Sequence, residues 1–494
     1  MQNIIPQIKN IVVLMLENRS FDNIVGWLYD KKISPKQFII PQGSSPDYYD
    51  GLHSLINTDV LNLNGRKPEF VSVTHGTSHY NIPSVDPDHT YQALNKQIYY
   101  SREPIEGDTA PLDGFVRQFA SQEDVKDPYE VMQMYTPEQL PVTTQLARNF
   151  AVSDRWFSSV PTQTLPNRAF LHSGTSEGHV NNSDNYIFDE KTIFEVLDDY
   201  QVSWKVYSDS GILPSLVRMN FRNLQKFEYR KQFLNFEDFI KDAEKGELPS
   251  YSFLEPMFLI TNKLLMNPDN RVTSGHPPYN MFSTEMFIAK VYNTIFSNPK
   301  NDDTLLLITY DEHGGIYDHV SPPWGATPPD DKSNPGQYNF SFNRFGIRVP
   351  TIAISPWIPE GVVFRSFGAP YDHTSILATI MDWKNIPRHS LRSKRVANAQ
   401  NISSIFTLDS PRKINRLIST PYNAEASKES ITEYENKTAS DLEKAILSCY
   451  FLYNNQRRQI PIAKSEIIKL LGDCKTKKNI GDKVCELTDQ KDIQ

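Results

Sequence analysis

Residues 10–16 read NIVVLML, a short apolar run rich in β-branched side chains. A run of this kind is typical of a strand that is buried on both faces. Comparable runs follow at residues 203–207 (SWKVY), 304–310 (TLLLITY) and 350–355 (PTIAIS). Amphipathic helical patterns lie between and after them, at residues 191–200, 283–298 and 374–383. Buried strands alternating with such helices predict an α/β fold around a central, mostly parallel sheet.

The composition and the segment boundaries narrow the class of protein further. The 494 residues are 39% hydrophobic, which excludes overall disorder, and the net charge of −8 disfavours a nucleic-acid binder. We expect one main domain over residues 1–405, with long loop insertions at about 36–113 and 317–344 that are rich in Pro, Gly, Asn and Asp. Residues 406–494 are expected to form a helical C-terminal region, with helices at 440–454 and 462–471 and a polar tail.

The termini and the cysteines bear on where the protein works. The first nine residues (MQNIIPQIK) lack the basic and apolar parts of a signal peptide, and no apolar run has the length of a membrane span. Cys449, Cys474 and Cys485 all lie late in the chain, where free thiols are favoured over a Cys474–Cys485 bridge. A soluble protein is expected, which is either cytoplasmic or exported by a route that reads no N-terminal signal.

Polar side chains gather where the predicted strands end. Glu17 and Asn18 follow the first strand, Asp311 and Glu312 follow the third, and His373 comes after the fourth. Ligands of open α/β sheets bind beyond the carboxyl ends of the strands, so these side chains are expected to meet. Each alone is also explained by a turn or a helix cap, but together they favour a metal site. Oxygen donors mixed with histidine suit Zn²⁺, Mn²⁺ or Fe.

A second pattern is the segment SSVPTQTLPNR at residues 158–168. It places a hydroxyl in a loop, then a proline suited to the first helical position, then Arg168 one turn on. A hydroxyl at a helix N-terminus lies in a field that favours its alkoxide, and an arginine beside it can bind two phosphate oxygens. The alternative is an ordinary Ser/Thr-rich loop. A threonine hydroxyl needs activation, which a divalent metal bound by Glu17, Asn18, Asp311 and Glu312 would supply.

Two histidines outside the strand ends are further candidates. His276, in SGHPP, is expected to hold a second metal or a phosphate oxygen, unless it is an ordinary loop histidine. His89, in DPDH, is expected to protonate a leaving group or to bind phosphate. Weaker candidates are His75, His79, His172, His179 and His319.

Four motifs in order resemble the bacterial phosphoesterase family, which contains phosphatidylcholine-hydrolysing phospholipases C and respiratory-burst-inhibiting acid phosphatases. The motifs are MLENRSFD (15–22), TLPNR with SGT (164–168, 173–175), YDEHGGIYDHV (310–320) and YDHTSIL (371–377). The resemblance covers roughly residues 8–387 and implies an alkaline-phosphatase-like α/β/α sandwich. It also implies a Ser/Thr nucleophile held at a metal and a covalent phospho-enzyme.

Transferred to this sequence, the resemblance implies a metal bound by Glu17, Asn18, Asp311 and Glu312 together with the nucleophile. Likeness to the nucleophile block of sulfatases points to Thr164 rather than Thr162 or Ser158. His276 and His373 would lie where relatives with two metals place ligands of the second ion, whereas phosphatase members use one metal.

The sequence therefore predicts a metal-dependent phosphoesterase, with Zn²⁺ ahead of Fe or Mn. The first expectation is a phospholipase C that cleaves phosphatidylcholine-type lipids through phospho-Thr164, with transient contact to a membrane surface. One alternative is an acid phosphatase acting on soluble monoesters, and another is a catalytically silent protein that binds a lipid or a partner. The missing signal peptide favours an effector delivered to host cells by a specialised secretion system, with the polar tail as a candidate address.

Overall fold

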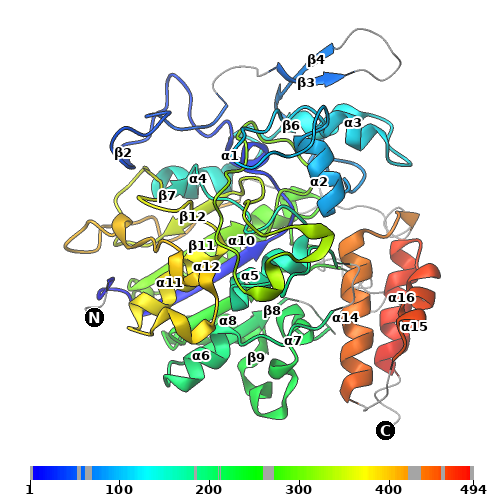
Figure 1. The fold of residues 1–494 in the computed structure, drawn as a ribbon. Coiled ribbons are helices and arrows are strands. Elements are labelled where there is room, and N and C mark those ends of the chain that lie inside the picture. The colour runs from blue at the N-terminus through cyan, green and yellow to red at the C-terminus, as the bar shows by residue number, and fades with distance from the viewer. Residues whose placement is uncertain are drawn as a thin grey trace.

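The structure is a computed structural model that describes residues 4–52, 57–61, 69–182, 186–209, 211, 213–259, 272–420, 436–457 and 462–489. Its centre is a nine-stranded sheet in the order β2-β13-β7-β12-β11-β1-β10-β8-β9 (Figure 1). The strands are, in that order, Gln37–Ile39, Val362–Phe364, Ala151–Ser153, Thr351–Ile354, Thr304–Tyr310, Asn10–Leu16, Tyr251–Glu255, Trp204–Ser208 and Phe233–Asn235. All four predicted strands are therefore confirmed.

The sheet is parallel except for one strand. β12 pairs antiparallel with both β11 and β7, and every other pair in the sheet is parallel. The prediction that β12 ends at the same edge as β1 and β11 was therefore wrong. The chain returns through β13, a three-residue strand too short to recognise in the sequence, and this return brings residues 371–373 to the edge where β1 and β11 end.

Helices cover both faces of the sheet. The ring of Phe194 on α6 (Ile193–Asp199) lies 4.7 Å from that of Trp204 on β8. The ring of Phe239 on α8 (Phe236–Lys245) lies 5.3 Å from that of Tyr207 on the same strand. Residues 204 and 207 point to opposite sides of a strand, so α6 and α8 belong to different layers. The predicted α/β/α sandwich is confirmed.

The three predicted helices near the sheet are α6, α10 (Met281–Phe296) and α11 (His373–Trp383). Besides α8, the other α-helices that the structure describes in the main body are α1 (Phe21–Val25), α2 (Tyr91–Ile98), α3 (Phe115–Ala120), α4 (Pro141–Asn149), α5 (Thr164–Ser173), α7 (Leu216–Asn220) and α12 (Lys394–Asn398). Short strands outside the sheet are β3 (Asn57–Leu61), β4 (Glu69–Ser72), β5 (Thr74–His75) and β6 (Gln133–Met134).

The described part of the C-terminal region contains three helices, which lie beside the sandwich (Figure 1). They are α14 (Asp441–Arg457), α15 (Lys464–Gly472) and α16 (Lys477–Asp489). The sequence predicts only a polar tail where α16 lies. Ile480, Val484 and Leu487 are buried there, and their spacing of four and three residues is a helical signal within an otherwise polar segment.

The structure also bears on the predictions about the cysteines and about membrane-spanning segments. All three cysteines are free, as favoured by the sequence. Among the described helices, none combines the length and the apolar character that a transmembrane segment requires.

Candidate active site

The site begins where the neighbouring strands β1 and β11 end. Leu16 and Tyr310 are paired across the two strands, so Glu17 and Asn18 emerge beside Asp311. The backbone N–H of Asn18 donates to Asp311 Oδ1 at 2.9 Å. Gly314 closes the following turn with a φ of 64°, and a Cβ added there would lie 2.3 Å from the carbonyl oxygen of Asn18. Only glycine therefore lets the two strand ends approach this closely.

Thr164 lies against these strand ends and is fully buried. It is the first residue of α5, so the helix begins two residues before Pro166, not at that proline as predicted. The hydroxyl of Thr164 is 3.1 Å from Glu17 Oε2 and 3.2 Å from Asn18 Oδ1. The hydroxyls of the two alternative candidates instead donate to backbone carbonyls, that of Thr162 to Val180 and that of Ser158 to Val160.

Arg168 occupies the next turn of α5 and binds Glu17. Its Nε donates to Glu17 Oε1 at 2.7 Å and lies 3.8 Å from Asp311 Oδ2. Its Nη1 is buried and has no hydrogen-bond partner among the described residues. The guanidinium is thus anchored on a carboxylate, and it has one nitrogen left to bind an anion.

The strand ends bring three carboxylates, Glu17, Asp311 and Glu312, close to a single arginine, Arg168. Burial, together with the neighbouring Asp311, raises the pKa of Glu17 well above its usual range, although Arg168 lowers it. Burial and the charge of Glu312 raise the pKa of Asp311 to about 6. Asp311 Oδ2 and Glu312 Oε1 are buried without a hydrogen-bond partner in the described structure. Crowded, unpaired carboxylate oxygens of this kind fit a divalent cation.

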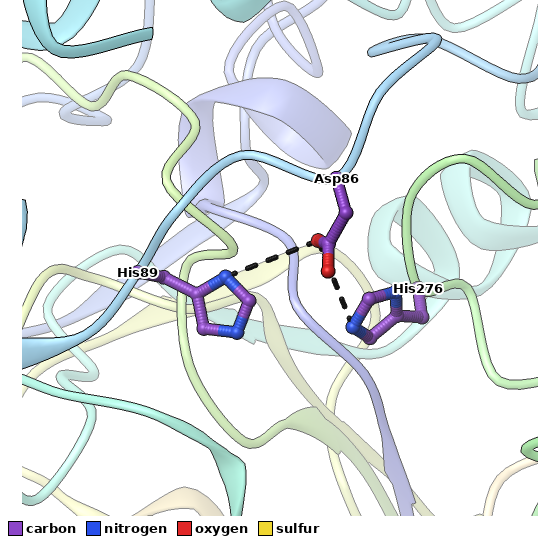
Figure 2. Close-up of side chains that lie close together, drawn as sticks. All are labelled: Asp86, His89 and His276. Carbon is purple, nitrogen blue, oxygen red and sulfur yellow. Dashed lines mark ion pairs between the residues drawn. The ribbon is translucent and has the colours of Figure 1, made fainter. Parts of the chain in front are cut away.

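Two histidines and an aspartate lie close together (Figure 2), and one of the histidines, His89, reaches Asn18 and Glu312. The carboxylate of Asp86 lies between two imidazoles, with Oδ1 3.9 Å from His89 Nδ1 and 3.8 Å from His276 Nε2. His89 Nδ1 donates to the carbonyl of Pro87 at 2.6 Å, and His276 Nδ1 donates to that of Pro277. The group has the residue types and the spacing to hold a metal ion.

His89 connects the two clusters. Its Nε2 lies 3.2 Å from Asn18 Nδ2 and 3.7 Å from Glu312 Oε1. Burial disfavours the charged ring, but Glu312 and Asp86 outweigh this and raise the pKa of His89 to about 10. The Asn18 amide can donate to Nε2 of the neutral ring. Glu312 on the Nε2 side and Asp86 on the Nδ1 side favour the protonated ring through their charge.

The pKa of His276 moves the opposite way. Burial, with the neighbouring positive charge of His89, lowers it well below its usual range. Its Nε2 has no hydrogen-bond partner among the described residues. Because Nδ1 donates to Pro277, the ring lone pair of His276 is on Nε2, which lies 3.8 Å from Asp86 Oδ1.

His373 lies on another side of Asp311. Its Nε2 donates to the Asp311 backbone carbonyl at 2.6 Å, and burial lowers its pKa to about 4. Asp372 caps α11, as the alternative interpretation of this segment expected. The described geometry groups His276 with Asp86 and His89, while His373 is not part of that group. A ligand role for His373 stays a prediction that would use its unpartnered Nδ1.

The weaker histidine candidates lie elsewhere. His172 is enclosed by the rings of Phe194, Phe221 and Phe253, His75 packs on Trp27 and His179 on Tyr186, and His79 is exposed. His319 belongs to a buried ion network that is described below. In the described structure, no hydrogen bond or ion pair connects any of these five histidines with Thr164 or with the carboxylates around it.

Two residues that shape the site, Asp86 and Arg19, were not among the predicted site residues. Asp86 stands three residues before His89, in the DPDH motif that drew attention to the histidine. Arg19 is buried, and it donates to the backbone carbonyls of Gly275 and Ile82. It thereby ties the loops that carry His276 and Asp86 to the end of β1. The position of Arg19 within the MLENRSFD motif was its only signal.

A second group of candidate metal ligands, Asp22, Asp318 and His319, binds the guanidinium of Arg348. Arg348 is fully buried, and its guanidinium donates to Asp22 Oδ1 at 3.0 Å and to Asp318 Oδ1 at 2.9 Å. His319 Nδ1 is 2.6 Å from Asp22 Oδ2, and its Nε2 is 3.3 Å from Asp50 Oδ1. With two carboxylates bound to one arginine, this network serves to hold the loops after β1 and β11 together.

The network makes stability depend on pH. Burial opposes the charged ring of His319, but Asp22 and Asp50 outweigh it and raise the pKa to about 9. A raised pKa in the folded state gives stability that is complete below about pH 6.5 and is lost as the pH rises through 9. We expect His319→Gln to lower the free energy of unfolding by up to about 3 kcal/mol at pH 6, with the deficit shrinking by pH 10.

Urea unfolding of both proteins between pH 6 and pH 10 measures this difference. His389→Gln, at an exposed histidine, is the control and should show no such trend. A deficit of His319→Gln that stays constant across this range would contradict a charged His319.

Comparison with known proteins identifies the family of this protein. The profile of the Phosphoesterase family matches residues 8–387, which is most of the chain. The chain belongs to this phosphoesterase family. As the sequence resemblance predicted, it is a phosphoric ester hydrolase. Family membership and the clustered acidic and histidine ligands together indicate a divalent metal ion.

Named relatives span most of this phosphoesterase. Non-specific phospholipase C1 of Arabidopsis thaliana is 36% identical over 417 residues, covering 82% of this chain and 72% of the relative. Phospholipase C B of Mycobacterium tuberculosis is 27% identical over 449 residues, covering 82% of this chain and 79% of the relative. Among solved structures, a phosphonate monoester hydrolase of Agrobacterium radiobacter matches with a TM-score of 0.33 at 9% identity, covering 54% of this chain and 72% of that one.

Proposed function

We propose that the protein is a phospholipase C that cleaves phosphatidylcholine-type lipids into diacylglycerol and a phosphorylated headgroup. The observation that carries this proposal is the buried Thr164 hydroxyl, 3.1 Å from Glu17 at the N-terminus of α5. The relatives named as phospholipases C support the substrate class. Zn²⁺ is the proposed metal, because the oxygen ligands lie beside the group of Asp86, His89 and His276, which adds imidazoles.

In the proposed reaction, Thr164 Oγ1 attacks phosphorus and the bond from phosphorus to the glycerol oxygen breaks. Glu17 Oε2 lies where it receives the hydroxyl proton, and the field of α5 favours the resulting oxyanion. His89 gives its Nε2 proton to the glycerol oxygen, which leaves as diacylglycerol. Water then attacks phosphorus and gives one proton to His89. The bond from phosphorus to Thr164 breaks, Thr164 Oγ1 takes its proton back from Glu17, and the phospho-headgroup is released.

The remaining residues hold the metal and the phosphate. Glu17, Asn18, Thr164, Asp311 and Glu312 would hold the cation, which when bound lowers the pKa of a hydroxyl ligand and neutralises phosphate charge. The free Nη1 of Arg168 is available to one non-bridging oxygen. The Nε2 of His276 would join Asp86 and His89 around a second ion.

Exposed apolar side chains support the proposed transient contact with a membrane. Of the thirteen large apolar side chains exposed among the described residues, seven lie between residues 33 and 129. They are Ile33, Phe38, Tyr48, Phe70, Tyr100, Ile105 and Tyr129. Loops with such side chains can insert into the headgroup layer of a bilayer.

The alternative function is an acid phosphatase on soluble monoesters, and comparing two chromogenic substrates tests it. We expect kcat/KM for nitrophenyl-phosphorylcholine to exceed that for nitrophenyl phosphate by at least about tenfold, since a diester site is built for two substituents. Phosphatidylcholine vesicles should yield diacylglycerol in parallel. A strong preference for the monoester would establish the phosphatase instead. Turnover of neither substrate, with a biological effect that survives both Thr164→Ala and chelation, would favour the silent binding protein.

The division into a catalytic domain (1–405) and a C-terminal region (406–494), and delivery to host cells by a specialised secretion system, are further proposals. The hydrophobic cluster that packs α14, α15 and α16 together is separate from the main core and supports the first, although Leu165, Phe258, Leu259 and residues of and beside α7 also join it.

A further inference from the structure

The C-terminal helices border the cavity that leads to the candidate site. This cavity has a volume of about 910 Å³ and is lined on one side by residues 84–90 and 122–126 and on the other by residues 436–441 and Lys444. Asp86, His89 and Gln163 lie in its wall. The first turn of α14 therefore faces the groups that the proposed reaction uses.

One contact joins α14 to the segment before the nucleophile. Gln163 directly precedes Thr164, and its Nε2 donates to Asp441 Oδ2 at 2.6 Å. Its Oε1 accepts the backbone N–H of Asn182 at 3.0 Å, so both ends of the amide are bound. Leu165, on the other side of Thr164, packs in the hydrophobic cluster of the C-terminal helices. Thr164 thus lies between two residues that α14 and its neighbours hold.

A second contact joins the same turn of α14 to the loop of His276. The hydroxyl of Tyr279 donates to Glu443, whose Oε1 lies 3.3 Å from Lys477 Nζ on α16. Lys477 Nζ also lies 3.6 Å from the centre of the Tyr279 ring. Glu443 and Lys477 are each 1% exposed, so this ion pair is held in the interior. The backbone N–H of Tyr279 donates to the carbonyl of His276 at 2.8 Å.

We propose that Asp441, Glu443, Lys477 and Tyr279 are positioning residues of the active site. Asp441 fixes Gln163 beside Thr164, while the buried Glu443–Lys477 pair acts through Tyr279 on the loop of His276. That loop places the imidazole of His276 against Asp86, which in turn faces the proton-carrying ring of His89. The proposal rests on the proposed function, and it makes the C-terminal helices a part of the catalytic apparatus.

A pair of Tyr→Phe variants tests the second contact. Tyr279→Phe removes the hydroxyl that reaches Glu443 and keeps the ring under Lys477. Tyr450→Phe is the matched control, because its buried hydroxyl bonds Thr488 at 3.0 Å between α14 and α16, away from the site. Each variant is assayed as the full chain on phosphatidylcholine vesicles and on nitrophenyl-phosphorylcholine, and its Tm is measured.

The two substrates separate positioning from general damage. A diacylglycerol alkoxide needs a proton to leave, whereas nitrophenolate leaves without one. We expect Tyr279→Phe to lower kcat on the lipid about tenfold while kcat on nitrophenyl-phosphorylcholine stays within about twofold. Tyr450→Phe should leave both rates unchanged. Gln163→Leu, which cannot bind Asp441, should lower both rates, because it disturbs Thr164 itself.

An equal loss on both substrates in Tyr279→Phe, or no loss at all, would overturn the proposal. If Tyr279→Phe does not fold, the double variant E443Q/K477M, which removes both charges of the buried pair together, is measured in its place with the same expectation. Wild-type protein that turns over nitrophenyl phosphate but neither diester would refute the proposed function instead, so the two failures are distinguishable.

Discussion

Thr164→Ala is expected to lower kcat by at least about 10⁴-fold, because it removes the atom that attacks phosphorus. Thr164 is fully buried, and its hydroxyl bonds only Glu17 and Asn18 in the described structure, so the loss of one oxygen should change Tm by a few degrees at most. Thr164→Ser keeps a hydroxyl at the same position and should retain activity within about tenfold.

The measurement is kcat on nitrophenyl-phosphorylcholine with Tm recorded in parallel. Thr162→Ala is the control, because the Thr162 hydroxyl donates to the backbone of Val180 and does not reach Glu17. If Thr162→Ala lost as much activity as Thr164→Ala at unchanged Tm, the assignment of Thr164 as the nucleophile would be contradicted.

Asp311→Asn is expected to weaken binding of the metal by at least about 100-fold and to lower activity by about 10³-fold. The exchange keeps the shape of the side chain and its bond from the Asn18 N–H, but removes the charge beside Glu17 and Glu312. Because it relieves repulsion among buried carboxylates, the metal-free variant should be at least as stable as metal-free wild type.

Elemental analysis after dialysis, together with Tm in the presence of chelator, checks both halves of this expectation. Glu285→Gln is the matched control, since Glu285 is a buried carboxylate that instead caps α4 through Val142 and Thr143. If Asp311→Asn kept its full metal content and full activity, Asp311 would not be a metal ligand.

The strand ends could be predicted because their signal is local. The apolar runs of β1 and β11 are long and unbroken, and the acidic residues follow each run directly, so placing Glu17 beside Asp311 required only that the two strands be parallel. Thr164 required more than its own segment, since nothing local separated it from Thr162 or Ser158. The resemblance to a known family supplied that choice, and the direction of the three hydroxyls agrees with it.

The parts that sequence analysis missed depend on contacts between distant segments. The direction of β12 and the existence of β13 follow from pairing in the finished sheet, and the periodicity of a three- or four-residue strand does not encode them. Asp86 reads as a loop residue until the chain brings it to His276, 190 positions later. Likewise Lys477 lies in a polar stretch, and only the packing of α16 on α14 makes it a buried partner of Glu443.

The most direct test of the central claim is a crystal structure of the metal-loaded protein with anomalous data collected at the zinc edge. We predict a peak within ligand distance, about 2.0–2.2 Å, of carboxylate oxygens from Glu17, Asp311 and Glu312, with Thr164 Oγ1 in the same coordination sphere. A peak bound only by residues outside this set, with Thr164 beyond reach of it, would contradict the account.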